Sequence, residues 1–321
     1  MNGVLVTGAS GFIGTAVCKT LLTAGRQVYG AVRGPGSRKL RISGCEPIAI
    51  GEIGPQTKWK QALSRVDTVV HLAARVHMRH DPMIAPLSAY RRVNVQGTLN
   101  LARQACAAGV RRFVFLSSIK VNGEESDPGR PFTTVDKPAP VDPYGISKME
   151  AEQGLRRMAA AVPMEVVIIR PPLVYGPGVK ANFLALMKLI DTGLPLPLAS
   201  IDNRRSMIYL GNLVNAVCAC MEHPNAAGKT FMVSDGEDLS VADLVRRLAR
   251  AMGKPARIFP VPQAFLSRLA RCPGPCSRLS KLIGSLTVDI SPISSDIGWW
   301  PPYSVAHGIR ETVSAFRKSD Q

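Results

Sequence analysis

The chain has 321 residues, of which 46% are hydrophobic, with a mean hydropathy of +0.08 and a formal net charge of +17. This composition indicates a globular protein, long enough for one two-part enzyme or two domains. No apolar run approaches the roughly 20 residues that span a bilayer, and no signal-peptide pattern opens the chain, so we expect a cytoplasmic protein.

The cysteines and histidines predict no metal site. The seven cysteines are scattered and odd in number, which favours reduced thiols over a disulfide framework. Cys272 and Cys276 have no second pair at zinc spacing. His71, His77 and His80 also lack metal-ligand spacing, and we interpret them as structural or loop residues.

The excess positive charge is concentrated between Arg246 and Lys281, where nine Lys or Arg and no acid occur. No zinc finger, helix-turn-helix or aromatic RNA-binding motif accompanies these residues, so nucleic acid is not an expected partner. A solvated face of a second domain is the favoured interpretation. Weak peripheral contact with an anionic membrane is the alternative, because several of the basic residues alternate with apolar ones.

The first predicted strand, residues 4–7, leads into three glycines spaced G-x-x-G-x-x-G and then into a helical pattern. Gly8 permits the turn, Gly11 lets a pyrophosphate approach the backbone, and Gly14 lets the helix pack against the strand. The free N–H groups at the helix start suit phosphates, although a glycine-rich turn without a ligand is the alternative. The predicted cofactor residues here are Gly8, Ser10, Gly11, Phe12, Ile13 and Gly14.

The next two predicted strands bear on the choice of cofactor. The strand over 27–33 ends at Arg33, where an acid would select NAD(H) by binding a ribose hydroxyl. A guanidinium suits a 2'-phosphate, so NADP(H) is slightly favoured over NAD(H); a surface arginine that stacks on the adenine is the alternative. The strand over 47–50 is followed by Glu52 and Ile53, an acid beside an apolar residue that is suited to the adenine amine.

The predicted strand over 66–74 ends in Leu72, Ala73 and Ala74. The two alanine side chains are small enough for the backbone to pass close under a nicotinamide ribose. A helical pattern over 90–109 then carries the polar Asn94 near its start.

The strand over 113–116 opens onto Ser117 and Ser118, at the strand end where open α/β sheets bind ligands. After a loop over 123–142, Tyr144 and Lys148 begin a helix and share one face, because they are four residues apart. The ammonium is expected to lower the pKa of the phenol and to let Tyr144 move a proton near neutral pH. An incidental surface pair is the alternative for such a spacing alone.

Taken together, these motifs resemble the extended short-chain dehydrogenase/reductase family, in the branch of nucleotide-sugar epimerases, dehydratases and 4-ketoreductases. The resemblance covers nearly the whole chain. It implies that Ser118 binds the reacting oxygen, that Tyr144 is the acid or base, and that Lys148 holds the nicotinamide ribose. The residues that carry the resemblance are Gly8, Gly11, Gly14, 71–74, Asn94, Gly97, Thr98, Ser117, Ser118, Tyr144 and Lys148.

The resemblance also implies an α/β fold, with a Rossmann-type doubly wound parallel sheet and a smaller, interleaved C-terminal α/β substrate domain. Residues 1–170 are the expected NAD(P)-binding domain, a segment near 207–235 returns to it, and 171–321 mainly bind substrate. Pro171 joins the cofactor residues at this boundary, and a homodimer is expected. The implied substrate residues are Ser118, Lys120, Asn182 and Arg205.

Departures from the family pattern bear on the reaction. The acids that dehydratases carry are missing at 117–119, and typical epimerases have Arg-Tyr-Phe-Asn where this chain has Arg-Pro-Pro-Leu at 170–173. With Arg33, these departures favour reduction of a UDP-4-keto-6-deoxy-N-acetylhexosamine for surface-polysaccharide precursors. A UDP-hexose 4-epimerase is the alternative, and a non-catalytic NADP-binding regulator is disfavoured because Tyr144 and Lys148 are both present.

Overall fold

The structure is a computed structural model that describes residues 3–34, 42–76, 86–262 and 283–319. Among these residues, no helix is both long enough and apolar enough to cross a bilayer. Of the residues singled out in the sequence, His77, His80, Cys272, Cys276 and the basic positions 268–281 lie outside the described ranges.

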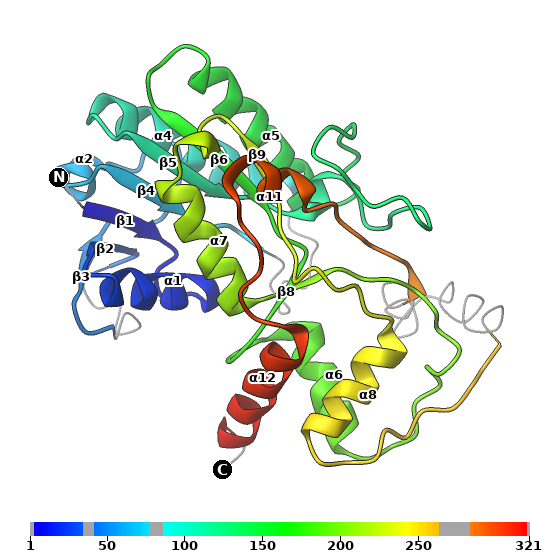
Figure 1. The fold of residues 1–321 in the computed structure, drawn as a ribbon. Coiled ribbons are helices and arrows are strands. Elements are labelled where there is room, and N and C mark those ends of the chain that lie inside the picture. Colours follow the sequence, from blue (N-terminus) through cyan, green and yellow to red (C-terminus); the bar gives the residue numbers. More distant parts are fainter. Residues whose placement is uncertain (1–2, 35–41, 77–85, 263–282, 320–321) are drawn as a thin grey trace.

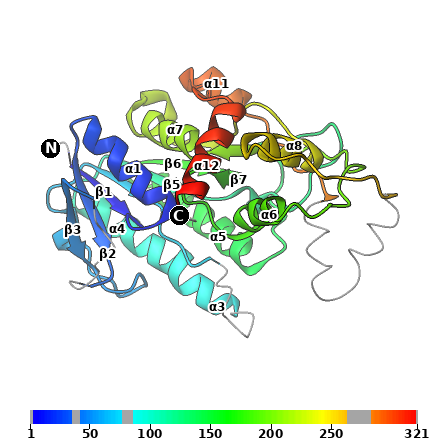
Figure 2. The same ribbon diagram turned by 90° about the horizontal axis from the view of Figure 1, so that it is seen from below.

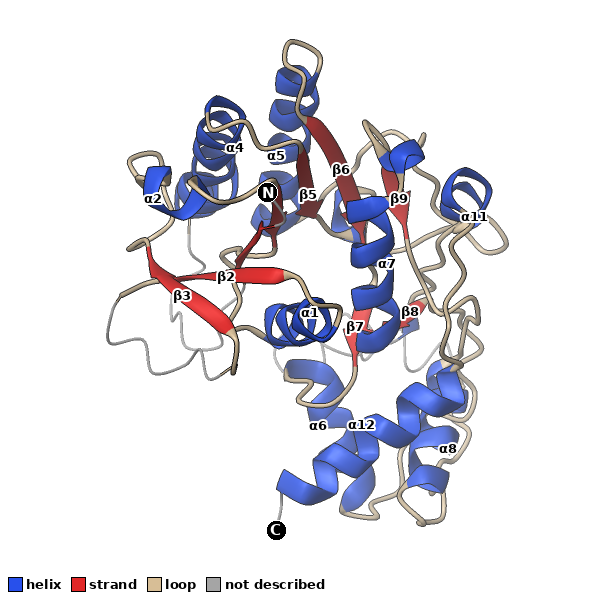
Figure 3. Cartoon of the chain, turned by 60° about the vertical axis from the view of Figure 1, so that its left-hand side comes forward, coloured by secondary structure: helices blue, strands red, loops and turns tan. Residues whose placement is uncertain are grey.

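A parallel sheet of seven strands forms the larger part of the molecule (Figures 1 and 3). Its order is β3-β2-β1-β4-β5-β6-β9, so the order reverses between β1 and β4, the point at which such sheets bind ligands. The strands are β1 Gly3–Thr7, β2 Gln27–Val32, β3 Cys45–Ala49, β4 Thr68–His71, β5 Arg112–Leu116, β6 Glu165–Arg170 and β9 Thr230–Met232. This is the doubly wound Rossmann-type sheet that the sequence predicted.

Helices cover both faces of this sheet, which explains the continuous apolar runs of its strands. Val4 and Val6 face the layer of α1 and α7, whereas Leu5 between them faces the opposite layer. The first layer contains α1 Phe12–Thr23, α7 Leu210–Glu222 and α11 Ser291–Ile297; the second contains α2 Lys60–Leu63, α4 Thr98–Ala107 and α5 Pro143–Ala159.

A smaller lobe with its own apolar core lies on the side of the molecule away from β3 (Figure 2). It contains α6 Ala181–Asp191, α8 Val241–Ala251, α12 Val305–Ser319 and a two-stranded parallel sheet of β7 Leu173–Tyr175 and β8 Met207–Tyr209. The chain enters this lobe after β6 and goes back to the large sheet through α7 and β9. It then enters the lobe again at α8, returns to the large sheet at α11 and ends in the lobe with α12. The domain boundary at residue 170 stays a prediction.

Candidate active site

The glycine turn connects β1 to α1 with very little space around it. Gly8 has a φ of +69°, and a Cβ on Gly14 would lie 2.1 Å from the Gly8 carbonyl oxygen. The Gly11 amide donates to that same carbonyl at 2.8 Å. Larger residues are therefore excluded at positions 8 and 14. Gly11 has no side chain to cap α1. Ser10 and Gly11 are exposed, and the next two residues, Phe12 and Ile13, are half-buried. The first amides of α1 are thus open to an anion.

The segment after β4 is tied closely to this turn. The amides of Leu72 and Ala73 donate to the Thr7 hydroxyl at 3.2 and 3.1 Å. A Cβ on Gly8 would lie 3.0 Å from the Ala73 amide nitrogen. The half-buried Ala74 continues the segment, so its backbone runs beside the turn as the sequence predicted.

His71 is a structural residue of this region. Its ring lies between the hydroxyls of Thr7, at 2.7 Å, and Thr98, at 2.9 Å, and it is fully buried. Burial, aided by the charge of Lys148, lowers the His71 pKa to about 3. Among the described residues, no group of three His, Cys, Asp or Glu side chains could hold a metal ion.

The residues expected at the adenine end lie at the neighbouring strand ends. Arg33 directly follows β2 and is exposed. Glu52 is exposed in the turn after β3, and Ile53 beside it is half-buried, where it fills the space that a Cβ on Gly97 would need. Their positions are compatible with adenosine binding, and their roles stay predictions.

Ser118, Tyr144 and Lys148 come together from β5 and α5. Ser118 follows β5 and starts the short 3₁₀ helix η2, Ile119–Val121. Asp142 caps α5 by accepting from the Gly145 amide at 2.6 Å, which fixes the first turn, where Tyr144 lies. The Ser118 side chain is close enough to the Tyr144 phenol to lower its pKa through a hydrogen bond. The Lys148 amine donates at 2.7 Å to the carbonyl of Leu116, two residues before Ser118.

The pKa of Tyr144 differs from the sequence-based expectation. Burial raises it, the charge of Asp142 raises it further, and only the hydrogen bond from Ser118 opposes the shift. Lys148 does not lower it, because burial lowers the pKa of Lys148 itself to about 7 and its amine is 5.9 Å from the centre of the tyrosine ring. The expected depression of the phenol pKa is thus wrong for the chain without cofactor.

Asn94 joins the segment after β4 to helix α5. Its side chain accepts from the Arg75 amide at 2.7 Å and donates to the Arg75 carbonyl at 3.0 Å and the Ser147 hydroxyl at 2.9 Å. It lies in a seven-residue π-helix, η1 Arg91–Gly97, between α3 Leu87–Tyr90 and α4. Such bulges in helices are frequent at functional sites. Neither the bulge nor the contact with Ser147 is apparent from the sequence.

A buried polar network next to the predicted catalytic residues was not apparent from the sequence. Glu152 accepts from the Ser117 hydroxyl at 2.5 Å and from two nitrogens of Arg170 at 2.9 and 2.6 Å. Arg170 also donates to Asn122 at 2.8 Å. The carbonyl of Pro171, the next residue, accepts from the Ile119 amide at 3.0 Å. The network therefore fixes the strand end that carries Ser118. Its sequence signal was the position of Glu152, four residues after Lys148.

Two of the predicted substrate residues, Lys120 and Arg205, have protein partners in this structure. The Lys120 amine pairs with Asp142 and, at 3.4 Å, with Glu124. Arg205 donates to the Gly284 carbonyl at 2.7 Å, and burial lowers its pKa even though Glu125 and Glu124 act in the opposite direction. Asn182 is exposed near the start of α6 in the smaller lobe.

These features fit a nicotinamide dinucleotide. The open glycine turn suits its pyrophosphate, and the buried Lys148, with Ser118 and Tyr144 close by, suits a ribose and a reacting hydroxyl. The fold and the site therefore define a short-chain dehydrogenase/reductase. The chain belongs to the NAD dependent epimerase/dehydratase family, whose model matches residues 4–234. This confirms the family resemblance and the class of cofactor; the slight preference for NADP(H) stays a prediction.

Several known proteins are similar over almost their full length. A UDP-glucose 4-epimerase of Vibrio cholerae is 44% identical, over 99% of this chain and 97% of the relative. The N-acetyl-alpha-D-glucosaminyl-diphospho-ditrans,octacis-undecaprenol 4-epimerase of Escherichia coli O157:H7 is 29% identical, over 97% and 94%. The solved structure of MoeE5 in complex with UDP-glucuronic acid and NAD is 26% identical, with a TM-score of 0.78 over 99% of both chains.

Proposed function

We propose that this protein is a nucleotide-sugar 4-epimerase that acts on a UDP-linked hexose. The observation that carries the proposal is the 44% identity to the Vibrio cholerae UDP-glucose 4-epimerase over nearly the whole of both chains. The proximity of the Ser118 and Tyr144 side chains, with the Lys148 amine bonded to the strand end that precedes Ser118, supports catalysis rather than binding alone. Reduction of a 4-keto sugar, which the sequence favoured, becomes the second candidate.

The chain's residues would handle the proton and hold the sugar. Tyr144 takes the proton from the C4 hydroxyl as that carbon becomes a ketone and gives it back after the sugar has turned, while Ser118 hydrogen-bonds the same oxygen. The bound nicotinamide supplies the acceptor and later the donor for the hydride on C4. No net oxidation results, because both the proton and the hydride return.

Lys148 has a pKa of about 7 before cofactor binds, so it gains or loses its charge near neutral pH. The charge of Glu152, one helical turn further along α5, raises that pKa and partly offsets the effect of burial. A ribose hydroxyl that accepts from the amine favours its protonated form. The protonated amine then favours the phenolate of Tyr144, which is the form that accepts the proton.

A UDP-linked substrate also needs contacts remote from C4. Arg205 is held by a main-chain carbonyl and lies near Glu124 and Glu125, so its guanidinium is fixed before any diphosphate arrives. A fixed fork is suited to a diphosphate, and such a contact supplies binding energy away from the reacting carbon. The Lys120 amine pairs with Asp142, which lies two residues before Tyr144. Lys120 is therefore the proposed contact nearer the sugar.

A UDP-4-keto-6-deoxy-N-acetylhexosamine reductase is the second candidate because of Arg33. Its exposed guanidinium at the end of β2 is suited to the 2'-phosphate of NADP(H). A reductase must release its cofactor in every cycle, whereas an epimerase retains its cofactor while the keto intermediate rotates in the site. Arg33 is the feature that distinguishes the two candidates in the cofactor site.

One experiment separates the two reactions. The purified protein is incubated with UDP-glucose or UDP-N-acetylglucosamine and no added cofactor, and separately with UDP-4-keto-6-deoxy-N-acetylglucosamine plus NADPH or NADH. The proposal expects conversion to the C4 epimer in the first arm, followed by NMR, with no stoichiometric use of reduced cofactor. Oxidation of NADPH in the second arm without epimer in the first would replace the epimerase proposal by the reductase.

A further inference from the structure

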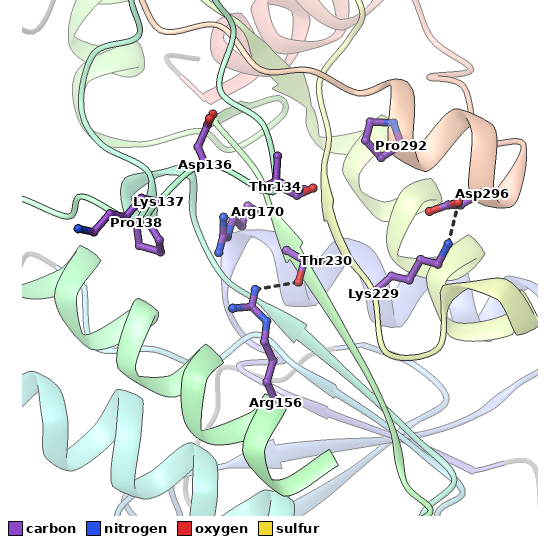
Figure 4. A pocket seen from close by; sticks show the side chains of 11 residues that line it. Thr134, Asp136, Lys137, Pro138, Arg156, Arg170, Lys229, Thr230, Pro292 and Asp296 are labelled. Atoms are coloured by element: carbon purple, nitrogen blue, oxygen red, sulfur yellow. Dashed lines mark hydrogen bonds and ion pairs between the residues drawn. The ribbon is translucent and has the colours of Figure 1, made fainter. Parts of the chain in front are cut away.

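A second pocket lies outside the active site, at the β9 edge of the large sheet. Its volume is about 470 Å³, within the range of small-molecule sites. It is bounded by the end of α5, by β6 and β9, by α11 and by the loop over 134–138 (Figure 4). The charged lining residues are Asp136, Lys137, Arg156, Arg170, Lys229 and Asp296.

The charges in the wall of this pocket are not balanced. Glu152 accepts from Arg156 at 3.0 Å with the same carboxylate that binds Arg170, so two guanidinium groups share one negative charge. Arg170 and Glu152 are almost fully buried, whereas the Arg156 side chain is 44% exposed. The excess positive charge is therefore in reach of a ligand at Arg156, where an anion can form charge-assisted hydrogen bonds with the guanidinium.

The donors that remain available also point to an oxyanion. Arg156 uses only Nη2 for its bonds to Glu152 and to the Thr230 hydroxyl, at 2.9 Å. Its Nε and Nη1, and the hydroxyl of Thr134, bond to no residue in the described ranges. Lys229 pairs with Asp296 at 2.7 Å and leaves two further N–H groups. Figure 4 shows Arg156, Thr134 and Lys229 on three different segments around the pocket, with Lys229 directed toward Asp296.

We propose that this pocket binds a small molecule through a phosphoryl group. A phosphate monoester carries nearly two negative charges and three acceptor oxygens, which suit the free N–H groups of Arg156 and Lys229 and the Thr134 hydroxyl. The pocket is much larger than a phosphate ion, so it also has space for the group that bears the phosphate. The site is separate from the epimerase proposal and does not depend on it.

The pocket is connected to the catalytic residues through Glu152. The carboxylate that holds Arg156 also accepts from Ser117, the neighbour of Ser118, and its charge raises the pKa of Lys148. A phosphoryl group on the free Arg156 nitrogens would place a second negative charge on the guanidinium that Glu152 holds through Nη2. Occupancy of the pocket is thus expected to alter the effect of the Glu152 carboxylate on the pKa of Lys148.

Calorimetric titration of the full chain tests the proposal. The probes are inorganic phosphate and glucose 6-phosphate, at constant ionic strength in chloride, with NAD⁺ and UDP present to fill the cleft at the glycine turn. We expect saturable binding of one equivalent of at least one probe. Tighter binding of glucose 6-phosphate would identify a phosphorylated metabolite as the ligand, and tighter binding of phosphate would identify the free ion; absence of saturable binding by both would overturn the site.

Variants of neighbouring arginines localise the binding. Arg156→Gln should weaken it by about tenfold or more, the effect of losing one charge-assisted contact. Arg157→Gln is the matched control, because Arg157 is exposed on the same helix and bonds only to the Gln153 carbonyl. Equal affinity in both variants would overturn the proposal. If circular dichroism shows that Arg156→Gln is not folded, Lys229→Met decides, since it leaves Glu152 and its partners intact; unchanged affinity in that variant would contradict the site.

Discussion

Lys148 lies one helical turn beyond Tyr144 on α5, and burial shifts the pKa values of the two side chains in opposite directions. The phenol pKa is raised and the amine pKa is lowered to about 7. Both shifts favour the neutral forms, so the chain without cofactor holds a neutral pair at mildly alkaline pH. A ligand that favours the charged amine would therefore change the protonation of both groups.

The first prediction concerns stability between about pH 7 and about pH 10. The folded pKa of Lys148 is about 7 and its ordinary value is 10.5, so the unfolded chain binds more protons in this window. The Lys148 contribution to the free energy of unfolding therefore rises with pH until the unfolded side chain also loses its proton. Lys148→Met should flatten this dependence in urea unfolding without cofactor. Lys19→Met, an exposed lysine on α1, is the control and should keep the wild-type slope. Equal slopes in wild type and Lys148→Met would contradict the shifted pKa.

The second prediction tests the proton carrier. Tyr144→Phe removes the hydroxyl and keeps the buried ring, so turnover should fall by about 10²- to 10⁴-fold with nearly unchanged NAD⁺ affinity. The matched control is Tyr175→Phe, which removes a buried hydroxyl bonded to Asp235 in the smaller lobe. The control should keep turnover within a few-fold of wild type. A fully active Tyr144→Phe protein would assign the acid or base to another group.

The third prediction addresses the cofactor. Arg33→Asp replaces the exposed cation after β2 by an anion, which repels a 2'-phosphate and accepts from a ribose hydroxyl. The ratio of NADP⁺ to NAD⁺ affinity, measured by fluorescence titration, should shift toward NAD⁺ by about tenfold or more, since a charge-assisted contact is lost. Lys19→Asp makes the same charge change on α1 and should leave the ratio unchanged. An unchanged ratio for Arg33→Asp would show that this residue does not contact the 2'-phosphate.

The sequence predicted those features that depend on residues close together in the chain. Gly8, Gly11 and Gly14 lie within one turn, and Tyr144 and Lys148 lie within one helical repeat, so fixed spacing was enough. The pKa of Tyr144 was not predictable, because its direction depends on how deeply the phenol is buried in the folded chain. The pairing of Glu152 with Arg170 could not be predicted from the sequence either, since this pairing requires α5 to pack beside β6.

That pairing leads to the last prediction. Glu152→Gln removes the one negative charge that two guanidinium groups share, and Arg170 would keep its charge while almost fully buried. Loss of one member of a buried ion pair costs about 3–5 kcal/mol, because the remaining charge has neither water nor a counterion. Urea unfolding should show a loss of this size in the free energy of unfolding.

Glu150→Gln is the matched control for this change. Glu150 lies on the same helix, and its partner Arg91 has a side chain that is 47% exposed, so water can solvate the cation that is left. The control should lose less than about 1 kcal/mol, as is typical of surface pairs. Equal losses in the two variants would mean that the Glu152 carboxylate is not the counterion of Arg170. A larger loss at Glu152 alone would show that this carboxylate neutralises Arg170 beside the strand end that leads to Ser118.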